Sequence, residues 1–154
     1  MSNPTISAKN VEYLKKMCSD AGIKLTHQRL DIFAELINSS GHPSVDEVYA
    51  RIQKRNPSIA IDTVYRTLAT FDDIGVIKKL HIMGEKALFD KNIDRHHHFV
   101  CTRCKGIQDI YWPEFDRAEA PAQAQVKGKI TSRHLEIRGI CNECIAAEEN
   151  IGEK

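Results

Sequence analysis

Four of the five cysteines form two pairs with a spacing that suits metal ligation. Cys101 and Cys104 flank Thr-Arg, and Cys141 and Cys144 flank Asn-Glu. Two thiolates at this spacing can face one Zn²⁺ ion, and two such pairs complete a closed tetrahedral shell that leaves no position open for catalysis. A redox disulfide pair is the weaker alternative, because two matching pairs would then be a coincidence. We therefore expect a structural four-cysteine zinc site.

A second group of side chains offers nitrogen and oxygen donors. The chain has three consecutive histidines, and in a strand His96 and His98 point to one face while His97 points to the other. Further potential donors are His42, Asp90 and Asp109. Imidazoles with carboxylates suit Mn²⁺, Fe²⁺, Co²⁺ or Zn²⁺, and two hard carboxylates favour iron or manganese. Spacing alone predicts only His96 and His98 as ligands, since a loop histidine and solvated aspartates explain the others.

The spacing of apolar residues predicts four helices in the first half of the chain, at about residues 7–20, 27–40, 44–55 and 60–74. Ser44 and Glu47 have the spacing of a capping box at the start of the third helix. Cys18 lies on the apolar face of the first helix and is expected to be a buried core thiol.

Two short β-prone runs follow, residues 76–80 and 87–89, around a turn at Met83, Gly84 and Glu85. Three helices, a recognition-like helix and a hairpin form the order of a winged helix-turn-helix domain, which places one helix in the major groove of DNA. A small helical core with a hairpin and no ligand is an equally good interpretation of this pattern.

The fourth helix is the candidate DNA-reading element. Its inward face is expected to hold Val64, Leu68 and Phe71, and its other faces Thr63, Arg66, Thr67 and Thr70. Arg66 could fork onto a guanine edge, and Tyr65 could touch a thymine methyl group or a phosphate. We expect Thr63, Tyr65, Arg66 and Thr67 to contact DNA. Phosphate contacts are expected from Arg51, Lys54, Arg55, Lys78, Lys79 and Lys86.

The second half alternates differently and predicts three strands, within residues 96–101, 105–112 and 129–141. A helix over residues 113–127 should connect the last two, kinked or split at Pro121. The whole chain is thus expected to be α+β, with an N-terminal winged helix-turn-helix domain at 1–90 and a C-terminal α/β domain at 96–154. The polar segment 91–95 is the expected hinge.

Composition bounds the class of protein. The 154 residues are 42% hydrophobic and 28% charged, as in an ordinary globular protein, and the net charge is +1. A DNA-binding protein with this balance must concentrate its cations locally. No apolar run approaches the roughly 20 residues of a membrane span, and the first ten residues lack a signal-peptide core. We expect a cytoplasmic protein without a membrane partner, in which cysteine pairs favour metal over disulfides.

These motifs, in this order, resemble the ferric uptake regulator family of bacterial metal-dependent repressors. The matching stretches are Leu25-Thr-His-Gln-Arg29, His42-Pro-Ser-Val-Asp-Glu-Val-Tyr49, Thr63-Val-Tyr-Arg-Thr-Leu68, Leu88-Phe-Asp90, His96-His-His98 and the two cysteine pairs. The resemblance implies a homodimer that binds double-stranded operator DNA, a C-terminal dimerisation domain and a structural zinc. It also implies a regulatory metal at the hinge that closes the dimer for DNA binding.

Within the family the chain is most similar to the peroxide-sensing branch. The positions that bind the regulatory Fe²⁺ or Mn²⁺ there match His42, Asp90, His96, His98 and Asp109. Peroxide sensors carry Asp at position 109, whereas iron sensors commonly carry Glu. The resemblance implies that the iron form reacts with H₂O₂ and that His42 or His96 becomes oxidised. An iron- or zinc-responsive uptake regulator of the same family is the alternative.

One departure from the family concerns an additional metal site that many relatives build. The matching positions here hold Arg95 and Arg133, which cannot ligate a cation, so that site is expected to be absent. Nothing in the chain proposes a substrate cleft with a general base beside an open metal, so an enzyme such as a metallohydrolase is not expected. A zinc-ribbon interaction module without a DNA role is the other rival interpretation.

Overall fold

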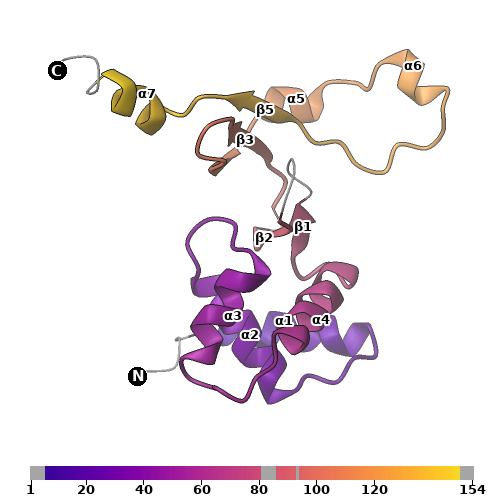
Figure 1. The fold of residues 1–154 in the computed structure, drawn as a ribbon. Helices are drawn as coiled ribbons and strands as arrows, with labels where there is room; N and C mark the ends of the chain where they lie inside the picture. Colours follow the sequence, from indigo (N-terminus) through magenta and orange to yellow (C-terminus); the bar gives the residue numbers. More distant parts are fainter. Residues whose placement is uncertain (1–5, 81–85, 93, 150–154) are drawn as a thin grey trace. The chain divides into compact units, whose positions relative to one another are not determined.

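Two units divide the chain, Met1–Ile93 and Asp94–Lys154. The computed structural model describes residues 6–80, 86–92 and 94–149 (Figure 1). The division falls within the segment 91–95 in which the sequence predicts a hinge.

Helices make up most of the first unit. Their bounds are α1 Ala8–Asp20, α2 His27–Asn38, α3 Val45–Gln53 and α4 Ile61–Asp73. Ser7, Thr26 and Ser44 cap the first three, each accepting a hydrogen bond from a backbone N–H three residues on. The predicted capping box is confirmed, because Glu47 also accepts the backbone N–H of Ser44 at 2.7 Å.

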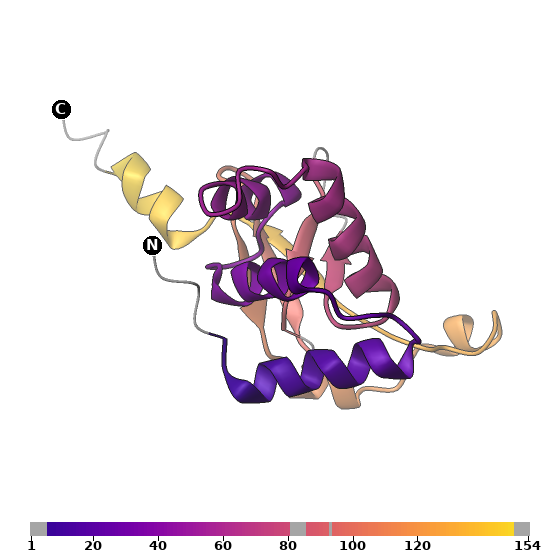
Figure 2. The same cartoon turned by 90° about the horizontal axis from the view of Figure 1, so that it is seen from below.

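The four helices pack around one apolar core (Figures 1 and 2). Val64, Leu68 and Phe71 of α4 are fully buried, as predicted. Phe71 meets Phe33 of α2 edge to face, with ring centroids 5.9 Å apart. Cys18 is buried in the same core, which confirms its expected role as a packing residue.

A two-stranded antiparallel sheet completes the first unit. It pairs β1 Lys78–Leu80 with β2 Leu88–Asp90, in the register that sets Lys79 opposite Phe89. The first strand is shorter than predicted and the second is shifted by one residue, and the expected turn at Met83, Gly84 and Glu85 lies outside the described residues. The backbone N–H of Lys79 donates to Asp72 of α4 at 2.8 Å, so α4 and the two-stranded sheet are directly connected.

A three-stranded sheet organises the second unit. The strands β3 His97–Cys101, β4 Ile107–Ile110 and β5 Glu136–Gly139 lie in the order β4-β3-β5, with β4 antiparallel and β5 parallel to β3. Short helices α5 Pro113–Arg117 and α6 Ala122–Gln125 follow β4, and α7 Asn142–Glu149 follows β5. The predicted connecting helix is therefore split, and Pro121 stands at the N-cap of its second part.

The expected fold class is confirmed: the chain is α+β, with a helical domain that carries a hairpin followed by a second α/β domain. Among the residues that the structure describes, no helix combines the length and the apolar character that a membrane span requires.

Candidate metal centres and a candidate DNA-reading helix

The four paired cysteines come together at one end of the three-stranded sheet. Cys101 ends β3 and Cys104 lies in the turn that follows, while Cys141 and Cys144 lie just before and within the first turn of α7. The sheet explains the meeting, because Cys101 is paired with Gly139 in the parallel register of β3 and β5. The chain therefore leaves two adjacent strands at the same end and places one cysteine pair after each.

The sulfur positions fit one tetrahedral ion. The Sγ atoms of Cys101 and Cys144 are 3.9 Å apart, those of Cys104 and Cys141 are 3.7 Å apart, and all four lie within 4.8 Å of one another. A tetrahedron with Zn–S bonds of about 2.3 Å has edges of about 3.8 Å. All four thiols are free, so the arrangement is that of a zinc shell and not of a disulfide.

The thiols of Cys101 and Cys144 differ in their affinity for a proton. The backbone N–H of Cys141 donates to the sulfur of Cys101 and lowers the pKa of that thiol to about 6. The neighbouring thiol of Cys141, followed by burial, raises the pKa of Cys144 to about 12. Negative charge accumulates unfavourably among sulfurs this close, and a divalent cation would remove that penalty.

A second group of donors lies at the opposite end of β3. His98 of β3 is directly opposite Asp109 of β4, and His96 comes just before the strand. The two Nε2 atoms are 3.0 Å apart, and Asp109 Oδ1 is 3.8 Å from the first and 3.9 Å from the second. Each separation is below twice the roughly 2.1 Å of a metal–nitrogen bond, so one ion can touch all three atoms.

The imidazole of His96 is oriented for such an ion by its other nitrogen. Its Nδ1 lies 2.6 Å from the backbone oxygen of Asp94, so Nδ1–H donates there and Nε2 keeps its lone pair. Two imidazoles and one carboxylate on one face, with further positions open, form the donor set that non-haem Fe²⁺ adopts in proteins. The site differs in this way from the closed shell of sulfurs.

The remaining two predicted ligands belong to the first unit. His42 lies in the loop before α3, and Asp90 ends β2. Their side chains are almost fully buried, with His42 Nε2 3.8 Å from Asp90 Oδ1. The adjacent Lys91 is partly buried. Burial and the nearby Arg51 lower its pKa, while Asp90 acts to raise it.

The middle histidine has a different function from its neighbours. His97 points away from them, as predicted, and is completely buried. Its Nδ1 accepts the backbone N–H of Leu135 at 3.0 Å, and its Nε2 lies 3.2 Å from Asp116 of α5. Since Nδ1 is an acceptor, Nε2 carries the proton and faces the carboxylate. Sequence reasoning did not identify Asp116, because nothing local marks its partner 19 residues earlier.

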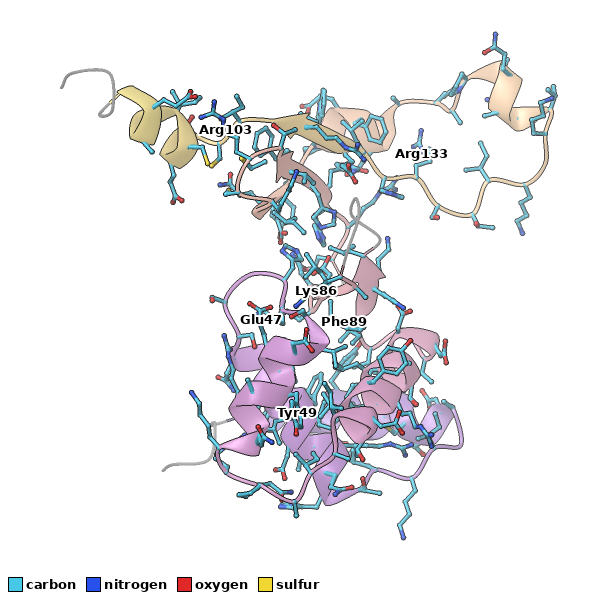
Figure 3. All side chains as sticks on the ribbon, in the orientation of Figure 1. Glu47, Tyr49, Lys86, Phe89, Arg103 and Arg133 are labelled. Carbon is cyan, nitrogen blue, oxygen red and sulfur yellow. The ribbon has the colours of Figure 1, made fainter. Side chains whose placement is uncertain are left out.

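Arg95 and Arg133, the two residues expected to exclude an additional metal site, both make bonds to α5 or to the residue that follows it. Arg95 Nε is 2.6 Å from Asp116 Oδ1, and Arg133 donates to the backbone oxygens of Asp116 and Ala118. The guanidinium of Arg133, labelled in Figure 3, also lies 6.0 Å from the centre of the Phe115 ring. The side chains of Arg95 and Arg133 thus connect α5 to the segments that precede β3 and β5.

On the candidate DNA-reading helix, most of the expected outward residues are accessible. Tyr65 is 49% exposed, Thr63 is half-buried, and Arg66 is exposed and paired with Asp62 at 2.9 Å. Thr67 is a correction, because its side chain is only 6% exposed. It lies three residues after Val64 and four before Phe71, so helical periodicity places it on the core face.

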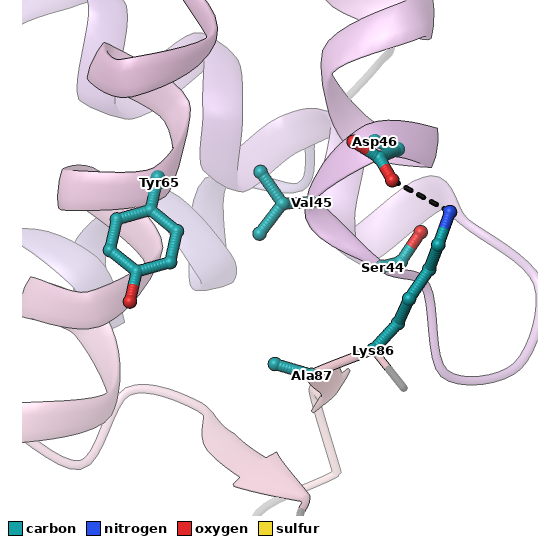
Figure 4. Close-up of a pocket in the computed structure, with 6 residues that line it drawn as sticks. All are labelled: Ser44, Val45, Asp46, Tyr65, Lys86 and Ala87. Carbon is teal, nitrogen blue, oxygen red and sulfur yellow. Dashed lines mark hydrogen bonds and ion pairs between the residues drawn. The ribbon is translucent and has the colours of Figure 1, made fainter. Parts of the chain in front are cut away.

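The cationic side chains that were expected to contact phosphates differ in their partners. Lys79 lies 5.9 Å from the centre of the Tyr65 ring, and Lys86 pairs with Asp46 at 2.8 Å beside a cavity of about 150 Å³ (Figure 4). Arg51 and Arg55, which were also expected to reach phosphates, make contacts within the first unit. Arg55 forms a largely buried ion pair with Glu35, and Arg51 donates to Ser39.

Comparison with known proteins places both units in one family. The model of the ferric uptake regulator family matches residues 20–151. The chain is 37% identical over 124 residues to the peroxide-responsive repressor PerR of Staphylococcus epidermidis, covering 80% of this chain and 83% of that protein. Among solved structures, the Helicobacter pylori regulator Fur, described with three functional metal binding sites, is similar at a TM-score of 0.73 and 23% identity, covering 94% of this chain and 97% of that one. The Vibrio cholerae Fur is similar at 0.66 and 28%, covering 83% and 99%.

Proposed function

This chain belongs to the ferric uptake regulator family, and we propose that it is a metal-dependent transcriptional repressor that senses peroxide. As a homodimer it binds operator DNA, and oxidation of a ligand histidine ends that binding. The family consists of metal-responsive transcription regulators and not of enzymes, and the winged helix-turn-helix domain with a dimerisation domain is its common architecture.

The observation that carries the proposal is the triangle of donor atoms from His96, His98 and Asp109. These nitrogen and oxygen donors suit Fe²⁺ or Mn²⁺ better than a structural zinc, which the four sulfurs of Cys101, Cys104, Cys141 and Cys144 would hold. His42 and Asp90 of the first unit would complete the regulatory shell. A metal bound by donors from both domains fixes the angle across residues 91–95, and DNA affinity then depends on that metal through linkage.

The proposed ligand set supports sensing by oxidation of a histidine ligand. When bound, Fe²⁺ supplies the electrons that cleave the O–O bond of H₂O₂. The nearest oxidisable groups would be the ligand imidazoles, of which His42 and His96 are the proposed targets, while the cysteines would be bound to zinc. In the net reaction one oxygen atom of H₂O₂ is inserted into a ring C–H bond, so the imidazole gains one oxygen and keeps its hydrogens, and the other oxygen leaves as water with the two peroxide hydrogens. The oxidised ring is a poorer donor, so the metal is released and the two domains become free to move.

The choice between peroxide and metal sensing rests on Asp109 and on the relatives. Asp in place of Glu gives a shorter carboxylate side chain at this position, as in the peroxide-sensing branch. The sequence identity of 37% to a peroxide-responsive repressor supports the same choice. The second candidate is an iron- or zinc-responsive uptake regulator. It has the same fold and the same donors, and it differs in the fate of the histidines after peroxide.

The DNA contacts belong to the first domain. Arg66 would reach a guanine edge, Tyr65 a thymine methyl group or a phosphate, and Thr63 the backbone or a base. The lysines that remain available for phosphates are Lys54, Lys78, Lys79 and Lys86. Lys86 would exchange Asp46 for a phosphate when DNA binds.

A mobility-shift titration on operator DNA tests the proposed function. The manganese form and the iron form should both bind, and the metal-free form with zinc retained should bind weakly. Brief treatment with H₂O₂ under exclusion of air should abolish binding by the iron form only. If peroxide leaves the iron form bound to its operator, the protein is an uptake regulator of the second kind.

A further inference from the structure

Lys91 connects the two segments of the first unit that carry His42 and Asp90. Its Nζ donates to the backbone oxygen of Ile37 at 2.8 Å and to that of Ser39. Ile37 lies in the last turn of α2 and Ser39 is its C-cap, where carbonyl groups have no partner within the helix. A cation at this end satisfies these carbonyls and the negative end of the helix dipole. We propose that Lys91 is a positioning residue for the regulatory metal, an inference that rests on the proposed function.

The loop that carries His42 is attached at both of its ends. Ser39, at its start, accepts the hydrogen bond from Lys91. Pro43, at its end, accepts the backbone N–H of Phe89 at 2.9 Å, and Ser44 forms a β-bridge with Leu88. Phe89 and Lys91 are the residues on either side of Asp90. The loop that carries His42 is thus bonded to the residue before Asp90 and to the residue after it. Phe89 is labelled in Figure 3.

The attachment point of Lys91 is itself rigid. Ser39 is buried, its hydroxyl donates to the backbone oxygen of Glu35 at 2.8 Å, and Arg51 donates to the same hydroxyl at 2.7 Å. These bonds do not involve Lys91, so its replacement leaves the end of α2 in place. What is lost is the connection between that helix end and the strand that carries Asp90.

The other ligand is held equally well. The backbone N–H of Asn92 donates to Asp90 Oδ1 at 2.8 Å, which fixes the rotamer of a carboxylate that is almost fully buried. With both loops fastened, His42 Nε2 and Asp90 Oδ1 stand 3.8 Å apart, a separation that one ion can bridge. Donors held at this spacing lose little conformational entropy when the ion binds, and affinity rises accordingly.

Manganese titration of the zinc-loaded protein tests this role, with the electron paramagnetic resonance signal of free Mn²⁺ as the readout. Lys91→Met should weaken Mn²⁺ binding on the order of 10-fold, the usual lower size of an effect from beyond the ligands themselves. Lys91→Arg keeps the cation and should recover part of the affinity. The matched control is Lys24→Met, which removes an exposed lysine and should change nothing.

A double-mutant cycle with His42→Ala distinguishes positioning from a general effect. If Lys91 acts through the loop of His42, Lys91→Met should cost little further affinity once His42 is gone. An equal cost in both backgrounds, wild-type affinity in Lys91→Met, or unfolding of that variant would each overturn the inference. The first two outcomes leave the proposed function standing if His42→Ala alone weakens Mn²⁺ binding. Unchanged binding in His42→Ala would instead refute the regulatory site itself, and Lys91 would have nothing to position.

Discussion

The two metal centres differ in their donors and in how the chain assembles them. The sulfur site draws all four ligands from one unit, at neighbouring ends of two strands that pair in the same sheet. The nitrogen and oxygen site takes three proposed ligands from that unit and two from the other. A closed thiolate shell would stabilise its own domain, whereas the proposed regulatory shell would couple the two domains. On the proposed function, the first metal is permanent and the loss of the second is the signal.

The two sites are also expected to differ in their reactivity toward peroxide. A zinc ion with four thiolate ligands has no open coordination position for peroxide and no redox chemistry of its own. The triangle of His96, His98 and Asp109 leaves positions open. On the proposed function, the reactive metal and the permanent metal would be bound at opposite ends of strand β3.

The largest expected effect is loss of the zinc shell. Cys141→Ser should release zinc and unfold or monomerise the second domain, because structural zinc contributes about 10–16 kcal/mol in small zinc domains. Metal analysis with size-exclusion chromatography and circular dichroism measures both results. Cys18→Ala, which removes the thiol of the helical core, is the control and should keep zinc. A stable, zinc-free dimer of Cys141→Ser would show that this site is not structural.

Removal of one regulatory ligand should affect binding without affecting the fold. His98→Ala should retain one zinc per chain and its thermal stability, and should lose manganese-dependent operator binding. The unmodified chain should hold two metals and not three, because Arg95 and Arg133 hold the place of an additional site. His134→Ala, at an exposed position, is the matched control. Three metals per chain, or an unchanged manganese response in His98→Ala, would contradict the assignment.

Loss of a DNA-reading side chain should be independent of both metals. Arg66→Ala should weaken operator binding by about 1–3 kcal/mol if the guanidinium contacts guanine at two positions. Fluorescence anisotropy on operator and on random DNA, in the manganese form, measures it. An equal loss on both sequences would indicate a phosphate contact only. No loss on either would move the reading surface away from α4.

The smallest expected effect comes from lengthening the carboxylate of the nitrogen and oxygen site. Asp109→Glu keeps a carboxylate opposite His98, so metal-dependent DNA binding should persist. A longer side chain alters the coordination of the iron, and oxidation by peroxide should become slower. The rate of histidine modification, followed by mass spectrometry, is the measurement. An unchanged rate would mean that the length of this carboxylate does not set the response.

Local sequence signals predicted a large part of this fold. The Ser44–Glu47 box caps α3 where it was expected, because capping depends on residues within one turn. The two cysteine pairs and the facing of His96 and His98 away from His97 also follow from short-range spacing. Pro121 splits the connecting helix for an equally local reason.

What the sequence did not reveal depends on distant partners. Arg55 was expected at phosphates but lies against Glu35, and Lys91 reaches the end of α2, more than 50 residues away in the chain. Asp116 meets His97 and Arg95 only because α5 folds back on the sheet. Thr67 is different, since the periodicity that buries Val64 and Phe71 already placed it inward.

Mass spectrometry of the two histidine peptides after peroxide tests the central claim most directly. The iron form should gain the mass of one oxygen atom on the peptide that carries His42 or His96, and the manganese form should gain none. The zinc content and the four paired cysteines should be unchanged. A Cys101–Cys104 disulfide with both histidines unmodified would make the sulfur site the sensor, and would contradict the division of labour between the two centres.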